Sequence, residues 1–373
     1  MFFWYGLIPI AGASYRRYKW SKFRRHFDEL RLHPLLDYSQ YRQIGKDGGI
    51  FRFTGGFESI TDEHTLWVRD ENLTIPILLE NTQSWLLPMQ EDEGVPEAPE
   101  RLKWNRLSTL TEGAKVFVGG LIKYKDNRLS FISTKENPLM VIFYDCTDTV
   151  LTDGIIRAGR TRNEYWNSIT PVSLAVGAMS ILYIAASFLN RPAFRLTVIT
   201  AFIAIFVPIL PMLPPGLLFT VLYRRLAWHA RKYRSYRDLA KLPLRYLPPG
   251  QTSGILNTGE KYGYVQFDEL PDSGIPLLLP EYPTEAKKTK WYVFGILDSV
   301  LDSAEGSGNL QIPSKSKDPF VSFGALPAEP HSLARRYSAA AYTTEFLAWV
   351  VLLAGVGINI TFIMMILSLL WKL

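Results

Sequence analysis

The sequence of 373 residues contains one cysteine and only five histidines. A single cysteine excludes a disulfide framework, and the scattered histidines leave no zinc ligand set rich in cysteine and histidine. The motifs GxGxxG, Walker A, GxSxG, HExxH and CxxC are also missing from the sequence. We therefore expect no catalytic residue, no metal site and no cofactor, and we predict that the protein is not an enzyme.

Charge is missing from three long stretches, residues 169–189, 196–222 and 346–370. About 20 apolar residues in a helix are enough to cross a bilayer core of ~30 Å. Because the core helices of soluble proteins rarely avoid charge for so long, we predict three transmembrane helices. The mean hydropathy of +0.02 is then an average over these spans and two polar blocks.

The second predicted span is interrupted by four prolines and a glycine. Proline removes a helix N–H and clashes with the preceding turn, so this span should be kinked or broken near Pro214 and Pro215. We favour a kinked packing helix over a substrate path, because no span contains Asp, Glu, Lys, Arg or His. The interrupting residues are Pro208, Pro211, Pro214, Pro215 and Gly216.

Residues 1–14 form a shorter apolar segment that ends just before Arg16. No basic residue precedes this segment, so we do not expect a cleaved signal peptide. The segment could be a short span, a re-entrant segment or an interfacial helix, and of these we favour insertion into the membrane.

Lysine and arginine gather beside the apolar segments and are interleaved with tyrosine and tryptophan. This pattern is typical of contact with anionic lipid headgroups, with aromatic rings at the membrane interface. Because each basic cluster adjoins an apolar segment, we expect anionic headgroups as partners and disfavour nucleic acid. The predicted interface residues are Arg16, Arg17, Lys19, Trp20, Lys22, Arg24, Arg25, Arg224, Arg225, Trp228, Arg231, Lys232 and Arg234.

The positions of these basic clusters predict the orientation. The positive-inside rule places the large clusters, and both polar blocks with them, in the cytoplasm. The short turn between the first two spans carries only Arg191 and Arg195 and lies on the opposite side. We predict an integral membrane protein of a bacterial inner membrane. An organelle membrane, with the blocks on the positive-inside face, is the alternative.

The two polar blocks contain three similar islands in the same order. Residues 73–80 match residues 273–281, residues 113–122 match residues 289–297, and residues 128–141 match residues 309–322. Because chance rarely produces three ordered matches, we predict a tandem duplication. The residues that anchor the match are Pro76, Gly120 and Pro138 in the first block and Pro276, Gly295 and Pro319 in the second.

Each polar block has short runs of β-branched and aromatic residues, with turn signals between them. Gly119 and Gly120 inside one such run indicate a bulge or a barrel corner. We therefore predict an α+β membrane protein with transmembrane helices and two small OB-like antiparallel β-barrel domains. The predicted regions are a basic membrane segment at 1–34, β-domains at 35–153 and 247–330, a transmembrane hairpin with a basic extension at 154–246, and a C-terminal span region at 331–373.

The order of these islands resembles the GIDE, or "beside a membrane", domain. Residues 113–120 and 137–139 carry the pattern in the first block, and residues 291–295 and 318–320 carry it in the second. The resemblance covers roughly half the chain and implies an OB-like module between transmembrane helices, with a binding or scaffolding role. Ligases of that family end in a zinc-binding RING finger, which this sequence lacks, so ligase activity is not implied.

The third span contains Asn359, an amide expected in the membrane interior, where it should hydrogen-bond to another helix. Gly355 and Gly357 nearby would allow a close helix or oligomer contact. We predict a non-catalytic, membrane-anchored interaction or scaffold protein, or a subunit of a larger membrane complex with a protein partner. A lipid- or small-solute-handling protein that uses the second span is the alternative, and single-stranded nucleic-acid binding by the β-domains is a third reading.

Overall fold

The computed structural model describes residues 2–45, 48–61, 64–80, 82–87, 99–102, 112–125, 128–160, 165–205, 216–271, 274–279, 290–297 and 312–372. The chain forms two compact units. The helical unit comprises Met1–Lys22, Thr161–Arg234 and Tyr337–Leu373. The β unit comprises Phe23–Arg160 and Ser235–Arg336. These limits cut across the predicted regions, because the β unit includes the ends of the predicted hairpin region 154–246.

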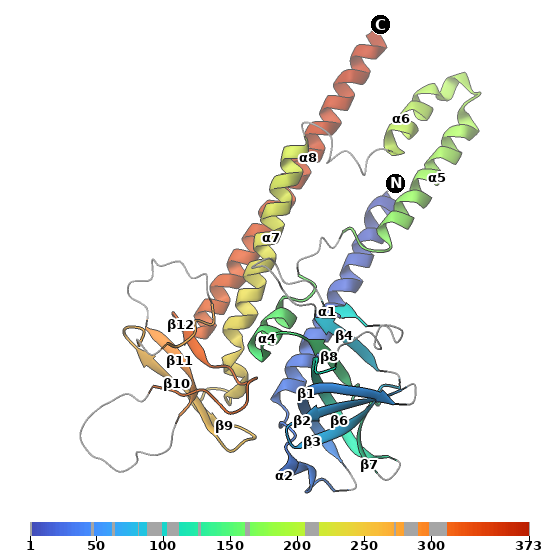
Figure 1. Ribbon diagram of the computed structural model, residues 1–373. Coiled ribbons are helices and arrows are strands. Elements are labelled where there is room, and N and C mark those ends of the chain that lie inside the picture. Colours follow the sequence, from blue (N-terminus) through green and yellow to red (C-terminus); the bar gives the residue numbers. More distant parts are fainter. Residues whose placement is uncertain are drawn as a thin grey trace. The chain divides into compact units, whose positions relative to one another are not determined.

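The β unit contains a five-stranded barrel, whose strands are labelled in Figure 1. Its strands are β1 (Gly49–Thr61), β2 (Thr65–Asp70), β3 (Leu73–Leu78), β6 (Lys115–Lys125) and β7 (Arg128–Ile132). They pair in the order β1-β2-β3-β7-β6, and a β1–β6 pairing closes the ring. The first half of β1 pairs with β6 and the second half pairs with β2. The α+β fold and one β-barrel are therefore confirmed.

The long strand β1 can close the barrel because it bends in its middle. Gly55 lies at the bend, where a Cβ atom would come within 2.4 Å of the carbonyl oxygen of Arg69. The register also shifts between Phe57 and Ser59, which marks a bulge. Bulges and glycines increase the local bend of a strand and are common at barrel corners. Fully buried side chains such as Phe53, Val118 and Phe131 fill the interior.

The barrel has Greek-key connectivity. Strands β1, β2 and β3 follow one another as neighbours, and β6 returns to lie beside β1, which gives the order 4-1-2-3 of that motif. Strand β8 (Met140–Tyr144) pairs with the other edge of β6. Strands β4 (Gln83–Leu87) and β5 (Glu100–Arg101) extend the sheet beyond β8. Two helices, α2 (Tyr38–Tyr41) and α4 (Asp148–Arg157), precede β1 and follow β8 in the sequence.

The second block forms a four-stranded antiparallel sheet instead of the predicted second barrel. Its strands are β9 (Ser253–Ile255), β10 (Lys261–Phe267), β11 (Trp291–Ile296) and β12 (Gly324–Leu326), in the order β12-β11-β10-β9. The longest of these strands, β10, has 7 residues against 13 in β1, and no pairing between described strands closes this sheet into a ring. The prediction of a second barrel is therefore wrong for the described residues, and residues 280–289 and 298–311 lie outside them.

Residues that match in the predicted sequence repeat lie only in part at equivalent positions of the barrel and the second sheet. Both β6 and β11 have an antiparallel neighbour on each side, and Gly120 and Gly295 lie within these central strands. However, Pro76 pairs with Trp67 inside the barrel, whereas the carbonyl of Pro276 accepts a hydrogen bond from Ala325 of β12. The two prolines therefore occupy different strand positions, and the duplication stays a prediction.

The helical unit contains the apolar segments (Figure 1). In the described part of the chain, two helices are long and apolar enough to cross a membrane. They are α5 (Thr170–Phe188) and the Pro330–Ile366 part of α8 (Pro330–Lys372). Most of their apolar side chains are exposed, among them Tyr183 at 76% and Leu353 at 65%. This composition and exposure suggest membrane association.

The second predicted span, 196–222, is not one described helix. A one-turn helix, η2 (Pro192–Phe194), precedes α6 (Arg195–Ile205), whose 11 residues reach only ~16 Å at 1.5 Å per residue. The next helix, α7 (Gly216–Lys241), begins directly after Pro215. Residues 206–215, with the four prolines and the predicted break, lie outside the described residues.

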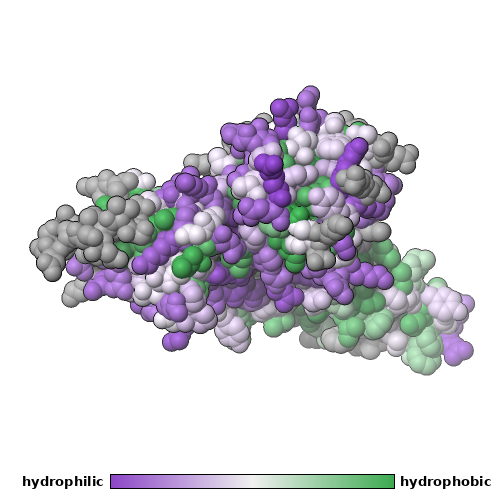
Figure 2. Space-filling model, turned by 90° about the horizontal axis from the view of Figure 1, so that it is seen from below, coloured by the Kyte–Doolittle hydropathy of each residue, from purple (hydrophilic) through white to green (hydrophobic). Residues whose placement is uncertain are grey.

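The N-terminal apolar segment is helical throughout its described residues. It consists of the π-helical turn η1 (Phe2–Leu7) and the start of α1 (Ile8–Leu32). Figure 2 shows a mainly hydrophilic surface, with apolar residues gathered in the fainter, more distant part of the view. The separation between polar and apolar segments in the sequence is therefore also visible on the surface.

Candidate functional site

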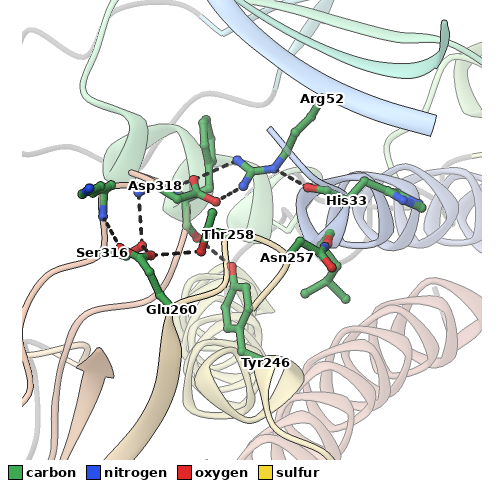
Figure 3. A network of polar contacts seen from close by, with 11 residues as sticks. His33, Arg52, Tyr246, Asn257, Thr258, Glu260, Ser316 and Asp318 are labelled. Atoms are coloured by element: carbon green, nitrogen blue, oxygen red, sulfur yellow. Dashed lines mark hydrogen bonds and ion pairs between the residues drawn. The ribbon is translucent and has the colours of Figure 1, made fainter. Parts of the chain in front are cut away.

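A buried ion pair joins the barrel to the second block (Figure 3). Arg52, on β1, donates hydrogen bonds to both carboxylate oxygens of Asp318 and to the carbonyl of His33, the last at 2.8 Å. Arg52 is 3% exposed and Asp318 is 4% exposed. Burial lowers the pKa of Arg52 to about 10, so the guanidinium stays charged at neutral pH. Two desolvated charges in bidentate contact hold their elements in one geometry.

The loop before β12 is built to present Asp318. The Asp318 carboxylate accepts the N–H of Phe320 at 3.0 Å, which fixes the Asp-Pro-Phe turn. Ser316 donates its hydroxyl to Glu260 at 2.5 Å and accepts the N–H of Asp318 at 3.1 Å. The ring of Phe320 lies 5.3 Å from the Arg52 guanidinium and contacts Phe117 of the barrel. The motif found in the sequence as part of a repeat is therefore a docking contact for the barrel.

A second polar group surrounds Arg31, near the end of α1. Arg31 is only 1% exposed, and its guanidinium lies 5.3 Å from the ring centre of Tyr246. Asp28 accepts a hydrogen bond from Arg245 at 2.6 Å. Burial raises the pKa of Asp28, and the charges of Arg31 and Arg245 oppose this shift. The side chains of this group join α1 to the segment between α7 and β9, which is a structural role.

The helical unit encloses a cavity of about 170 Å³, which we name the interface cavity. Helices α1, α7 and α8 and the segment before α5 contribute to its wall. Arg234 forms an ion pair with Glu345, and the rings of Tyr223 and Trp349 lie 6.2 Å apart. The residues that line it are Ile10, Ala13, Ser14, Arg17, Tyr165, Tyr223, Ala227, Ala230, Arg231, Arg234, Glu345, Ala348 and Trp349.

Hydrogen bonds hold the N-terminal segment against the start of α5. Pro9 has no N–H to donate to the carbonyl of Tyr5, and the hydroxyl of Tyr165 donates to that carbonyl at 2.7 Å. Asn167 donates to the carbonyl of Pro9 at 3.1 Å, and Ser173 donates to that of Trp4 at 2.5 Å. Backbone groups freed by proline in an apolar helix need such partners. These contacts position α1 beside the cavity.

The predicted interface residues separate into two groups. Arg17, Arg231 and Arg234 line the interface cavity. Lys232 lies 4.9 Å from the ring centre of Trp228, and Arg24 donates to the carbonyl of Ala158 within the β unit. The others lie on α1 or α7 outside the cavity, and they are Arg16, Lys19, Trp20, Lys22, Arg25, Arg224 and Arg225.

The predicted helix-packing residues lie on different faces of α8. The Asn359 side chain is buried, and its Oδ1 accepts the N–H of Gly216 at 3.2 Å. Gly216 is the first residue of α7, so this amide satisfies one of the N–H groups that a helix start leaves unpaired. Gly355 is close to Phe219, where a Cβ would approach to 2.6 Å, whereas nothing lies within 4 Å of the Cβ position of Gly357.

The described residues contain no group of three or more His, Cys, Asp or Glu side chains that could hold a metal ion. Burial raises the pKa of the Cys146 thiol, which disfavours the thiolate that a nucleophile needs. Sequence reasoning singled out the motif at residues 318–320 but missed Arg52, its contact with Asp318 and the interface cavity. The contact joins residues that are distant in the sequence, and the cavity depends on side chains from four separate segments.

Comparison of the chain with models of known protein families finds no match, and comparison with curated proteins finds none either.

Proposed function

We propose that this protein is a non-catalytic scaffold or complex subunit, anchored in a membrane by α5 and α8, whose β unit binds a protein partner. The observation that carries the proposal is the exposure of the apolar side chains of these helices. Met179 is 67% exposed and Phe346 is 64% exposed, and such surfaces require cover from lipid or another protein.

The β unit supplies the interaction part of this proposal. A closed five-stranded Greek-key barrel is the arrangement of OB-type domains, which use their faces and loops for binding. Its attachment to the second sheet through Arg52 and Asp318 makes a preorganised surface. We infer that this module is related to the GIDE domain and that it lies in the cytoplasm beside the basic clusters.

Membrane anchoring and orientation are tested together with single cysteines. In a Cys146→Ser background, Lys125→Cys places a thiol on an exposed barrel hairpin, and Asn190→Cys places one in the turn after α5. In intact cells, an impermeant thiol reagent should label the Asn190→Cys variant but not the Lys125→Cys variant. Release of the protein by alkaline extraction would refute anchoring, and the reverse labelling pattern would refute the orientation.

The scaffold role is tested by purifying the full chain in a mild detergent and measuring the mass and composition of the particles. A stoichiometric protein partner supports the scaffold role. A monodisperse monomer with bound lipid favours the lipid-handling alternative, for which the interface cavity is the specific observation.

A further inference from the structure

Arg31 carries a guanidinium group that is buried without a hydrogen-bond partner. The residue is 1% exposed, and none of its three guanidinium nitrogens has a hydrogen-bond partner in the described part of the chain. The last turn of α1 suits a cation, because the negative end of the helix dipole lies there, but this supplies no hydrogen bond. Burying a donor or a charge without a partner costs free energy. A bound group that accepts hydrogen bonds would therefore stabilise the fold at Arg31.

A second unused donor lies near Arg31, on β10. Tyr262 is 0% exposed, and its hydroxyl has no hydrogen-bond partner among the described residues. Burial raises the pKa of Tyr262, and the nearby charge of Arg31 opposes this shift. The ring of Tyr246 contacts both residues, since its centre lies 5.3 Å from the guanidinium carbon of Arg31 and 5.2 Å from the ring centre of Tyr262. The Tyr246 hydroxyl is already used, because it donates to the carbonyl of Phe320 at 2.7 Å (Figure 3).

The arginines near this central tyrosine ring outnumber the carboxylates that pair with them. Burial raises the pKa of the tyrosine, and the charges of three arginines oppose this shift. Arg245 donates to Asp28 at 2.6 Å, and Arg52 donates to Asp318. Arg31 is the third arginine, and no carboxylate in the described part of the chain bonds to it. One positive charge is therefore left over, which a single monovalent anion would balance.

Burial and charge together restrict what can bind to these donors. Asp238, whose charge also acts on Asp28, is held by Arg160 and Arg237 and does not supply the missing acceptor. Because both unused donors are almost completely buried, a halide ion suits them better than an oxyanion such as phosphate, which is larger and carries more than one charge at neutral pH. Water is the competing occupant, since Oδ1 of Asp28 also lacks a hydrogen-bond partner among the described residues.

We propose that the Arg31 guanidinium and the Tyr262 hydroxyl bind a chloride ion inside the β unit. The ion accepts hydrogen bonds from both groups and balances the charge of Arg31. It joins the end of α1 to β10, two elements that are far apart in the sequence, so anion binding stabilises the attachment of the second sheet. Both residues belong to the β unit, and the site does not depend on membrane anchoring or on a protein partner.

The test is thermal unfolding of the full chain, purified in a mild detergent, while sodium chloride replaces sodium gluconate at constant ionic strength. Gluconate is a monovalent anion too large for an enclosed site, and constant ionic strength keeps the screening of charges unchanged. Chloride and bromide should raise the unfolding midpoint in a saturable way, by roughly 2–4 °C at ten times the dissociation constant. Equal midpoints in chloride and gluconate would overturn the proposal in favour of water, and a rise without saturation would overturn it in favour of a general salt effect.

Two variants of the site and one matched control connect the response to Arg31. Arg31→Met removes the charge and should abolish the saturable response. Tyr262→Phe removes only the hydroxyl and should weaken the apparent chloride affinity roughly tenfold. Arg42→Met is the control, because Arg42 also lies over a tyrosine ring, that of Tyr38 at 5.8 Å, but is exposed. It should change the affinity less than about twofold, and equal losses in all three variants would overturn the proposal.

The midpoint in gluconate separates loss of the site from loss of the fold. Arg31→Met and Tyr262→Phe each remove a group without a hydrogen-bond partner among the described residues, so both should unfold close to the native midpoint when chloride is absent. A second readout does not depend on stability. In crystals grown with bromide, an anomalous scattering peak should lie between Arg31 and Tyr262, and ordered protein at this position without such a peak would overturn the proposal.

Discussion

The barrel and the second sheet of the β unit are both built around a central strand with two antiparallel neighbours, yet among the described residues the barrel has the larger core. Its cluster includes Phe53, Val118 and Phe131, all almost completely buried. The described cluster of the second sheet consists of Ile275, Val293 and Ala325. Because apolar burial is the main source of stability, the second sheet should depend on contacts with the barrel.

Two contacts between the barrel and the second block show where that dependence lies. Arg52 and Asp318 are 266 residues apart in the sequence, and they meet in a buried bidentate pair. Phe320 adds an aromatic contact with Phe117 at 5.3 Å. A region with a small core can therefore be ordered by docking one charged loop onto a stable neighbour.

The largest predicted effect comes from breaking this docking contact. Asp318→Ala leaves the Arg52 guanidinium buried without its carboxylate, which should cost about 3–5 kcal/mol. We expect the second sheet to lose protection in hydrogen exchange while the barrel strands stay protected. The double variant Arg52→Met with Asp318→Leu removes both charges and should recover most of the loss. Equal loss of protection in barrel and sheet would contradict the proposed dependence.

A smaller effect on the free energy of unfolding should distinguish Gly295 from Gly120, the two glycines that match in the predicted repeat. A Cβ on Gly295 would come within 2.5 Å of the backbone carbonyl of Ser314, whereas a Cβ on Gly120 would mainly meet the end of the Leu139 side chain at 2.8 Å. A side-chain end can move more easily than backbone. We expect Gly295→Ala to lower the free energy of unfolding by about 1–3 kcal/mol and Gly120→Ala by less, as measured by denaturant unfolding.

The ion pair between Arg160, which follows α4, and Asp238 of α7 should contribute about 1–2 kcal/mol to the free energy of unfolding. This contribution should depend on pH. Burial alone would raise the pKa of Asp238, but the charges of Arg160 and Arg237 and their hydrogen bonds lower it below the ordinary value. A carboxyl whose pKa is lower in the folded state stabilises the fold above its ordinary pKa near ~4. This stabilisation is lost as the pH falls through the lower, folded-state pKa.

The measurement is the free energy of unfolding between neutral and acidic pH for the native protein and for Arg160→Gln. The variant should be less stable at neutral pH and should show a smaller loss of stability on acidification. Arg157→Gln is the matched control, because Arg157 pairs with Asp153 within the same helix. Identical pH profiles for the native protein and Arg160→Gln would refute the assignment.

The smallest expected effect is at Arg31. The guanidinium nitrogens of Arg31 are buried and have no hydrogen-bond partner among the described residues, so an apolar side chain of similar length removes an unsatisfied buried group. Arg31→Met should therefore change the free energy of unfolding by no more than about 1 kcal/mol in urea denaturation without chloride. Arg31→Ala should be clearly less stable, since it also removes the packing of the long side chain against Tyr246.

Sequence reasoning succeeded where local composition decides the structure. The apolar runs predicted α5 and the apolar part of α8, and the run around Gly119 and Gly120 is a strand of the barrel, as predicted. It failed for the second barrel, because barrel closure depends on strand length and on a bend such as the one in β1. Two similar central strands do not indicate whether the remaining strands close a ring.

The sequence by itself determined which segments are apolar enough for a membrane and where the basic clusters adjoin them, because both properties depend on runs of neighbouring residues. Only the tertiary structure decided that Arg52 meets Asp318 and that Arg17 and Arg231 line one cavity. These arrangements join residues from distant segments, and their energies depend on burial and geometry that no local pattern contains.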